Sequence, residues 1–228
     1  MLDAGVVTGY GTVEGCPCFA YAQKDGVFTS ASAERVRRRE ALAQKNGAPV
    51  AAIFDSPGAK LTEGVELLSA YGVLLHAANS LSGVIPQIAV VTGACLGTSA
   101  LLAAASDFVI AAKDAELYLS ASDKAESAAE AGIAHRTAAD AGAAIADARR
   151  LIALLPSNNL DAAPMYDFAA PAAADALRDE EPDIEAAIRA AADEDSLLAL
   201  SEGYAPEALT FLGTVAGQPA AFAGVSGE

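Results

Sequence analysis

Apolar residues fall into short blocks along the first half of the chain, and glycine-rich or polar segments separate the blocks. Their alternation predicts a β-hairpin, with strands at 5–13 and 16–23 joined at Glu14-Gly15. Continuous apolar runs predict buried strands rather than half-exposed ones. These runs are VAAIF (50–54), Gln87–Val91, Asp107–Ala112 and Glu116–Leu119.

Helical spacing of apolar residues alternates with these strands. The predicted helices cover 33–46, 61–80, a small-residue stretch that ends near Ser106, 140–155 and 183–192. Ser30 or Ser32 can cap the first helix. In the second helix, Leu61, Val65, Leu68 and Gly72 lie near one face. Strands that alternate with helices indicate an α/β fold.

Residues 81–112 are almost uncharged and are long enough to span a bilayer. Pro86-Gln87, Gly93 and Asp107 divide this stretch into pieces of roughly 6–10 residues. The pattern therefore favours a buried strand, a turn at Gly93–Gly97, a packed helix and a second strand over a membrane span.

A seven-residue segment occurs twice. GTVEGCP (11–17) recurs as GTVAGQP (213–219), and a short apolar strand follows each copy. A chance match is one explanation, because many hairpins use such turn residues. The offset of 202 residues equals one domain length and favours duplication. We therefore expect a first domain at 1–165, an Ala/Pro and acidic linker with a short helix at 166–195, and the first hairpin of a truncated second domain at 196–228.

Charge and composition narrow the possible partners. The chain has 228 residues, 14 Lys and Arg against 30 Asp and Glu, and a net charge of −16. This acidity argues against nucleic acid as a partner. The basic run Arg35–Arg39 is the exception, and it indicates either a solvated helix face or a contact with the phosphates of a coenzyme.

The cysteines favour a reduced compartment. The chain has three, Cys16, Cys18 and Cys95, and only two histidines. An odd number fits no complete disulfide framework, and this set lacks the ligands of a typical zinc site. The beginning, Met1-Leu2-Asp3, lacks the basic region of a signal peptide. We expect a cytoplasmic protein with no metal.

Two strand-to-helix turns are candidates for chemistry. Gly93-Ala94-Cys95-Leu96-Gly97-Thr98 leads into a small-residue helix, whose first N–H groups have no intrahelical acceptor. Asp55-Ser56-Pro57-Gly58-Ala59-Lys60 follows another buried strand. One N–H from each turn could hold a single developing oxyanion. Taken alone, each turn is more typical of an ordinary strand-to-helix connection that binds no ligand.

A serine nucleophile is a weaker candidate. Ser99 would need a base, and His76 and His135 are the only histidines in the chain. The G-x-S-x-G motif of hydrolases is absent.

These turns, in this order, resemble the carboxyltransferase subunits of biotin-dependent acyl-CoA carboxylases and related acyl-CoA decarboxylases, in the crotonase-like superfamily. The resemblance covers most of 1–165. Its segments are VVTGYGTVEGCPCFAYAQ (6–23), NGAPVAAIFDSPGAKLTEGVELLSAYG (46–72), SGVIPQIAVVTGACLGTSALLAAASDFVI (82–110), SAAEAGIAH (127–135) and LLPSNNL (154–160).

The resemblance implies a crotonase/ClpP-like spiral of ββα units, with two such domains in tandem. The first domain would bind acyl-CoA and the second carboxybiotin, which releases CO2 to a thioester enolate. Biotin would arrive on a separate carrier protein, because this chain has no A-M-K-M-type motif. Gly97 and Thr98 stand where the family has a Gly-Gly pair that holds the thioester oxygen. The implied substrate-binding residues are Pro57, Gly58, Ala59, Lys60, Cys95 and Leu96.

Several positions depart from the family pattern. Pro57 replaces a glycine and removes an N–H donor, and Lys60 replaces an arginine. The chain is shorter than the family between Leu119 and Ser127, and it lacks a helical lead-in before Leu2.

We therefore expect the acyl-CoA-binding half of a biotin-dependent carboxyltransferase. A biotin carrier protein and a complementary carboxyltransferase chain would be its partners. An unpaired apolar hairpin at 207–224 would also favour a homo-oligomer. One alternative is a non-catalytic assembly subunit or a degenerate crotonase-like protein. Another is a hydrolase or isomerase that acts alone with Glu63, Glu66 or His76 as acid or base.

Overall fold

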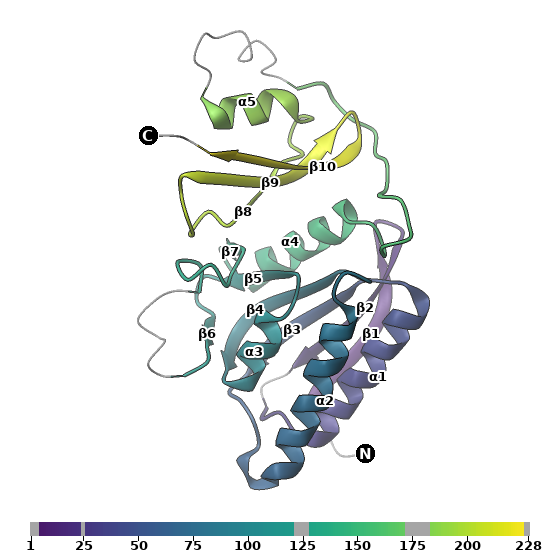
Figure 1. Ribbon diagram of the computed structural model, residues 1–228, viewed down its shortest axis with the longest axis vertical. Coiled ribbons are helices and arrows are strands. Elements are labelled where there is room, and N and C mark those ends of the chain that lie inside the picture. The colour runs from purple at the N-terminus through teal and green to yellow at the C-terminus, as the bar shows by residue number, and fades with distance from the viewer. Residues whose placement is uncertain (1–4, 24–25, 121–127, 172–182, 226–228) are drawn as a thin grey trace.

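A computed structural model describes residues 5–23, 26–120, 128–171 and 183–225 (Figure 1). Within these ranges, two sheets lie on either side of helix α4, which contacts strands of both (Figure 1). The predicted α/β class is confirmed.

The larger sheet has seven strands in the order β1-β2-β3-β4-β5-β7, and β6 also pairs with β4. The pair β1–β2 is antiparallel, and every other pair in this sheet is parallel. The strands are β1 Val6–Val13, β2 Cys16–Gln23, β3 Val50–Ser56, β4 Gln87–Leu96, β5 Phe108–Ala112, β6 Glu116–Tyr118 and β7 Arg136–Ala138. The sequence did not predict β7.

Helices cover both faces of this sheet. They are α1 Ser30–Asn46, α2 Val65–Leu81, α3 Thr98–Ala104 and α4 Ala141–Leu154, with a 3₁₀ turn, η1, at Leu61–Glu63. On one face, α1, α2 and α3 bury residues such as Tyr21, Phe54 and Val91. On the other face, α4 packs against residues such as Val90 and Ile110. Every second residue of these strands faces each core, as the continuous apolar runs require.

Helix α1 begins three residues earlier than predicted, and its cap differs from the predicted one. The N-cap is Thr29, whose hydroxyl accepts from the N–H of Ser32 at 3.1 Å. The Ser32 hydroxyl in turn accepts from the Thr29 N–H, which completes a capping box. Ser30 is the first helical residue, and Gly47 ends the helix in a left-handed conformation with φ +59°.

Helix α2 buries a different face from the one that the apolar spacing suggested. Leu61, Val65 and Leu68 are 86%, 81% and 69% exposed. The buried face is made of Leu67, Tyr71, Leu74, Ala78 and Leu81. Both faces are apolar, so spacing alone did not identify the inner one.

Strand β4 continues through the predicted turn at Gly93–Gly97. Ala94, Cys95 and Leu96 pair with β6, and the turn is confined to Gly97. A Cβ at Gly93 would lie 2.2 Å from Oδ1 of Asp55 on β3, so a larger residue here would require the Asp55 carboxylate to move.

The smaller sheet contains β8 Leu198–Leu200, β9 Ala208–Val215 and β10 Gln218–Val225, all antiparallel. Hairpin β9–β10 has the same register as β1–β2, shifted by 202 residues in both strands. The hairpin at 207–224 was expected to be unpaired, but β8 pairs with its outer strand. Helix α5 Ile184–Ala191 covers β10, where Ile184 lies against Gly224.

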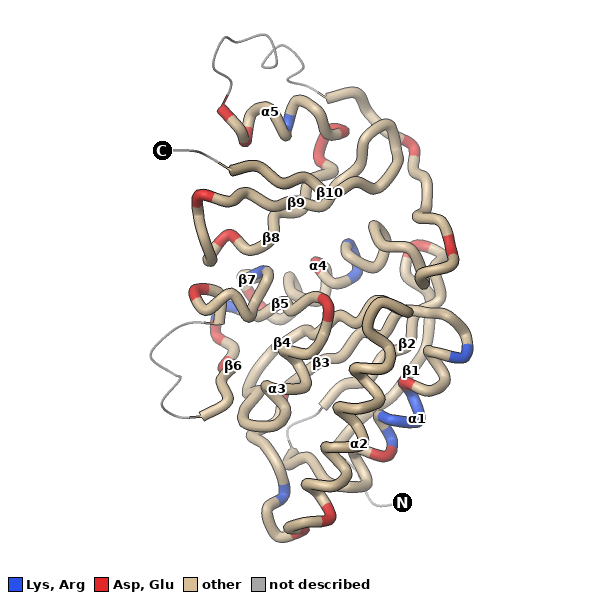
Figure 2. The backbone as a smooth tube through the Cα atoms, in the orientation of Figure 1, with Lys and Arg blue, Asp and Glu red and all other residues tan. Residues whose placement is uncertain are grey.

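The basic run of α1 is engaged within the chain (Figure 2). Arg35 donates to the Val6 carbonyl at 2.9 Å, and Arg39 donates to the Thr8 hydroxyl at 3.1 Å. Arg37 and Arg38 both pair with Glu34 at 2.7 Å. These contacts favour the interpretation as a helix face over that of a phosphate site.

None of the helices in the described ranges is long and apolar enough to cross a membrane. Cys16, Cys18 and Cys95 are free thiols.

Candidate active site

Two loops leave adjacent parallel strands at the same level of the sheet. Ser56 at the end of β3 is the register partner of Cys95 near the end of β4. The loop 57–60 therefore begins beside the junction of β4 and α3. The carboxyl ends of neighbouring parallel strands are the usual place for a ligand in α/β folds.

The first loop is fixed by a short parallel bridge between Phe28 and Ala59. The Phe28 N–H donates to the Gly58 carbonyl at 2.8 Å, and the Lys60 N–H donates to the Phe28 carbonyl at 2.8 Å. In such a bridge, the N–H of the middle residue, Ala59, points away from its partner. Phe28 follows β2, so the Ala59 N–H faces the opposite side, toward β4.

The side chain of Ser56 holds this loop in place. Its side chain is fully buried, and its hydroxyl donates to the Gly26 carbonyl at 2.8 Å and accepts from the Gly58 N–H at 3.3 Å. Gly58 adopts φ +123°, a conformation that favours glycine. The N–H of Gly58 is therefore used within the loop, and Pro57 has none.

The second loop presents Thr98 rather than Gly97 as a donor. Gly97 has φ +61°, and its N–H donates to the Tyr118 carbonyl at 3.1 Å. Thr98 is the first residue of α3, where an N–H has no acceptor within the helix. Of the two predicted catalytic residues, Gly97 shapes the turn and Thr98 offers the N–H.

Buried hydroxyl and aromatic groups support α3 from beneath. The Ser99 and Tyr71 hydroxyls lie 3.1 Å apart, and both side chains are buried. The Phe28 ring stacks on Tyr71 with centroids 5.0 Å apart. One aromatic pair thus links the bridge of the first loop to the start of the second. Within the described ranges, Ser99 is a packing residue whose hydroxyl partner is Tyr71 and not a histidine.

Cys95 and Leu96 lie in strand β4 rather than in a loop. Burial raises the pKa of the Cys95 thiol to about 12, so the thiol stays protonated near neutral pH. Cys95 therefore contributes packing and backbone pairing at this site.

The acid and base candidates are engaged elsewhere or exposed. The Glu63 carboxylate accepts from the Ser30 N–H at 2.8 Å and lies 3.6 Å from the Lys60 ammonium. The hydrogen bond from the Ser30 N–H is the main cause that lowers the pKa of Glu63. Glu66 and His76 are exposed on α2. This arrangement does not favour a hydrolase or isomerase that acts alone.

The geometry supplies two backbone donors, Ala59 and Thr98, in loops at the same end of the sheet. Such a site can stabilise negative charge on a carbonyl oxygen. The sequence identified both loops. It missed Phe28 and Tyr118, whose backbone contacts with Gly58, Lys60 and Gly97 decide which N–H groups remain available.

Comparison with known proteins identifies the family. A family profile described as "Carboxyl transferase domain" matches residues 1–129 and 122–227. The chain belongs to the carboxyl transferase domain family. The two matched segments overlap at 122–129, across the end of the region between Leu119 and Ser127 that the sequence predicts to be shortened.

Similar proteins include two bacterial carboxyl transferase family members. The "Methylmalonyl-CoA decarboxylase subunit alpha" of Veillonella parvula is 35% identical over 185 residues, which cover 72% of this chain and 36% of the relative. The "Propionyl-CoA carboxylase beta chain" of Roseobacter denitrificans is 30% identical over 259 residues, which cover 96% of this chain and 51% of the relative. The chain thus spans about half the length, or less, of these relatives.

A solved structure confirms the crotonase-like fold of this carboxyl transferase chain. The transcarboxylase 12S structure, a hexamer with methylmalonyl-coenzyme A bound, has a TM-score of 0.89 and 28% identity. It matches 97% of this chain, which covers 49% of that one.

Proposed function

We propose that this chain forms the acyl-CoA-binding half of a biotin-dependent carboxyltransferase. The observation that carries the proposal is the pair of loops after β3 and β4. The first loop contains the Ala59 N–H and the second contains the Thr98 N–H, and both loops lie at the same end of the sheet. Family membership and the relatives' names support acyl-CoA thioesters as the substrate class.

The two N–H groups would act on the thioester oxygen. When the α C–H bond breaks, its electron pair delocalises onto this oxygen as an enolate, and the enolate carbon then forms the new bond to CO2. Preorganised N–H groups stabilise such developing charge more than they stabilise the neutral thioester. Because the buried Ser56 and Tyr71–Ser99 contacts fix both loops, the donors need no rearrangement during the reaction.

Biotin on a separate carrier protein would supply the carboxyl group and accept the α-proton. The site described here contains only backbone donors and no competing base, which fits a reaction whose base arrives with another molecule. We assign the biotin side to a complementary carboxyltransferase chain. The assembly would be a cytoplasmic oligomer.

The first test is a calorimetric titration of the purified chain with propionyl-CoA, with free CoA as the reference ligand. We expect saturable binding that is tighter for the thioester than for free CoA. An absence of heat from a folded, monodisperse sample would contradict the proposal and favour a non-catalytic subunit. Equal affinity for both ligands would contradict the role of the loops.

Replacement of Thr98 by proline removes the donor with little strain. Proline is well tolerated at the first position of a helix, whereas Gly97 at φ +61° cannot accept it. We expect Thr98→Pro to reduce carboxyl transfer about 100-fold, as loss of one oxyanion donor does in other enzymes. The matched control, Thr98→Ala, keeps the N–H and should retain activity.

A further inference from the structure

Tyr71 on helix α2 contacts a supporting residue of each loop. Its hydroxyl lies 3.1 Å from the hydroxyl of Ser99, the residue that follows Thr98 in the chain. Its ring stacks on the ring of Phe28, with centroids 5.0 Å apart and planes inclined by 29°. Phe28 in turn forms the backbone bridge with Ala59. One side chain of α2 therefore touches a residue joined to each of the two donors.

The second loop depends on the Tyr71 hydroxyl because α3 has little else to orient its first turn. The helix has seven residues, and its N-cap, Gly97, makes no side-chain cap hydrogen bond. A helix this short takes its orientation from tertiary contacts. Ser99 is fully buried, so its hydroxyl needs a partner inside the protein, and the Tyr71 hydroxyl is that partner. Burial raises the pKa of Tyr71, so the phenol keeps its proton near neutral pH.

The first loop depends on the position of Phe28. The Phe28 N–H donates to the Gly58 carbonyl and its carbonyl accepts from the Lys60 N–H, both at 2.8 Å. This bridge is isolated, and Phe28 belongs to no strand. A hydrogen-bonded ladder therefore does not fix Phe28. Its ring is 2% exposed, and the packing of this ring against Tyr71 fixes where the bridge lies.

We propose that Tyr71 is a positioning residue of the carboxyltransferase site, which orients the Thr98 N–H through Ser99 and the Ala59 N–H through Phe28. This inference rests on the proposed function, because that function assigns both N–H groups to the thioester oxygen. Tyr71 is 3% exposed, so it acts through the residues that it holds and not by contact with the substrate.

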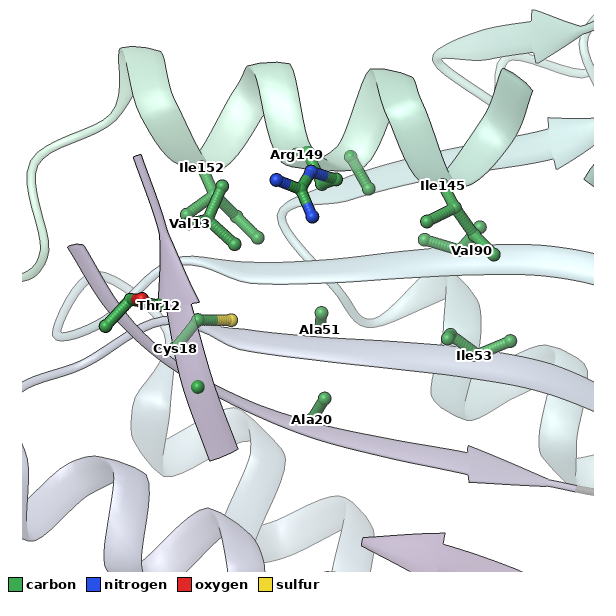
Figure 3. Close-up of a pocket in the computed structure, with 12 residues that line it drawn as sticks. Thr12, Val13, Cys18, Ala20, Ala51, Ile53, Val90, Ile145, Arg149 and Ile152 are labelled. Carbon is green, nitrogen blue, oxygen red and sulfur yellow. The ribbon is translucent and has the colours of Figure 1, made fainter. Parts of the chain in front are cut away.

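A second place for an acyl group lies on the opposite face of the sheet. There an apolar hollow of about 230 Å³ is lined by residues such as Ala51, Ile53 and Val90, with α4 on its other side (Figure 3). Tyr71 and Phe28 belong to the core on the α2 face instead. An acyl group that bound in this hollow would not respond to the Tyr71 hydroxyl, so variants of Tyr71 distinguish the two places.

The test follows the thioester carbonyl of propionyl-CoA that is isotopically labelled at this carbon and bound to the whole chain. Hydrogen bonds to the oxygen polarise the C=O bond, so binding to the wild type should lower its infrared stretching frequency relative to free ligand. We expect Tyr71→Phe to show a smaller lowering. Calorimetry should show about fivefold weaker binding of propionyl-CoA by this variant, which corresponds to the loss of one hydrogen bond.

A double-mutant cycle tests whether the two hydroxyls act as one unit. Ser99→Ala removes the other half of the same hydrogen bond and should have the same effect as Tyr71→Phe. The double variant should then bind propionyl-CoA no more weakly than either single variant. Its unfolding midpoint should recover toward that of the wild type, because no buried hydroxyl lacks a partner, whereas the carbonyl frequency should not recover. A merely structural contact predicts that both recover together.

Tyr21→Phe is the matched control. Tyr21 is a buried tyrosine of the same core, and its ring packs edge-on against Phe54 of β3 with centroids 6.1 Å apart. The substitution removes a phenol hydroxyl that supports neither loop. We expect the carbonyl frequency and the affinity for propionyl-CoA to stay at their wild-type values.

The outcomes separate this inference from the proposed function. A wild type that leaves the carbonyl frequency unchanged, or that binds no propionyl-CoA, would contradict the proposed function and this inference with it. A wild-type shift that Tyr71→Phe retains in full would overturn only the role of Tyr71. Losses that multiply to about 25-fold in the double variant would also overturn it, because independent residues give such additivity.

Discussion

Hairpins β1–β2 and β9–β10 have the same register, and both central turn residues of each have positive φ. In the first hairpin, Glu14 and Gly15 have φ of +48° and +84°, and the values for Ala216 and Gly217 are +50° and +78°. Their surroundings differ. The second turn donates two backbone N–H groups to the Asp193 carboxylate and accepts from the Tyr166 N–H, whereas the glycines of the first hairpin have open space around them. Local sequence thus sets the hairpin geometry, and the neighbouring segments determine how much the hairpin is covered.

Replacement of the turn glycines, Gly15 and Gly217, by alanine should give the largest difference in stability between the two hairpins. At Gly217 a Cβ would collide with the Tyr166 carbonyl oxygen, but at Gly15 nothing lies within 4 Å. Both changes bear the cost of a left-handed alanine, about 1–2 kcal/mol. We expect Gly217→Ala to reduce the free energy of unfolding by about 4 kcal/mol, because a backbone collision is added. Urea denaturation measures both values, and equal effects would show that the turn contacts are weak.

The two hairpins should also respond oppositely to pH. Burial raises the pKa of Glu40, on the helix that covers β1 and β2, from 4.5 to about 8. The folded chain then retains a proton that the unfolded chain releases. Its stability should fall by roughly 3 kcal/mol between pH 5 and pH 8, and Glu40→Gln should remove this slope.

Asp193 gives the stability of the second hairpin the opposite dependence on pH. Burial alone would raise its pKa, but hydrogen bonds from Thr214, Gly217 and Ala216 outweigh burial and lower it. The ionised Asp193 therefore contributes fully to the free energy of unfolding when the pH is above the usual pKa of an aspartate. This contribution is lost as the pH falls through the lowered pKa. Hydrogen-exchange protection factors, which are corrected for the intrinsic exchange rate at each pH, should fall in acid for the β9–β10 amides and in mild alkali for the β1–β2 amides. The same pH trend in both hairpins would contradict this assignment.

Replacement of the equivalent strand glycines, Gly11 and Gly213, by valine should give the smallest difference in stability between the two hairpins. Gly213→Val forces Leu197 and Ser196 to move, and we expect a loss of about 2 kcal/mol. Gly11→Val meets no neighbour within 4 Å and should be neutral or slightly stabilising, since valine favours strands. Thermal unfolding of the two variants provides the measurement. A large loss for Gly11→Val would contradict the open space around Gly11.

The sequence predicted the elements whose signals are local. Glu14-Gly15 marked the first hairpin, the GTV repeat marked the second, and the apolar runs marked β3, β4 and β5. The division into domains at 165 and 195 stays a prediction. Strand β8 was missed because Leu198–Leu200 is too short to show alternation, and it forms only by pairing with β9.

Tertiary contacts decided the rest of the site. The loops at 57–60 and 97–98 were recognisable, yet the engaged N–H of Gly97 depends on Tyr118, which lies 21 residues further along the chain. Strand β4 continues past Gly93 because Ala94, Cys95 and Leu96 pair with β6. Neither contact has a pattern in the sequence.

The glycines of β1 also bear on solubility. An open sheet edge invites pairing with any extended chain, which is the first step of aggregation. Gly9 and Gly11 have low strand propensity and present no side chains that could interlock with a copy of themselves. The edge is consequently a poor template for the pairing of unselected chains.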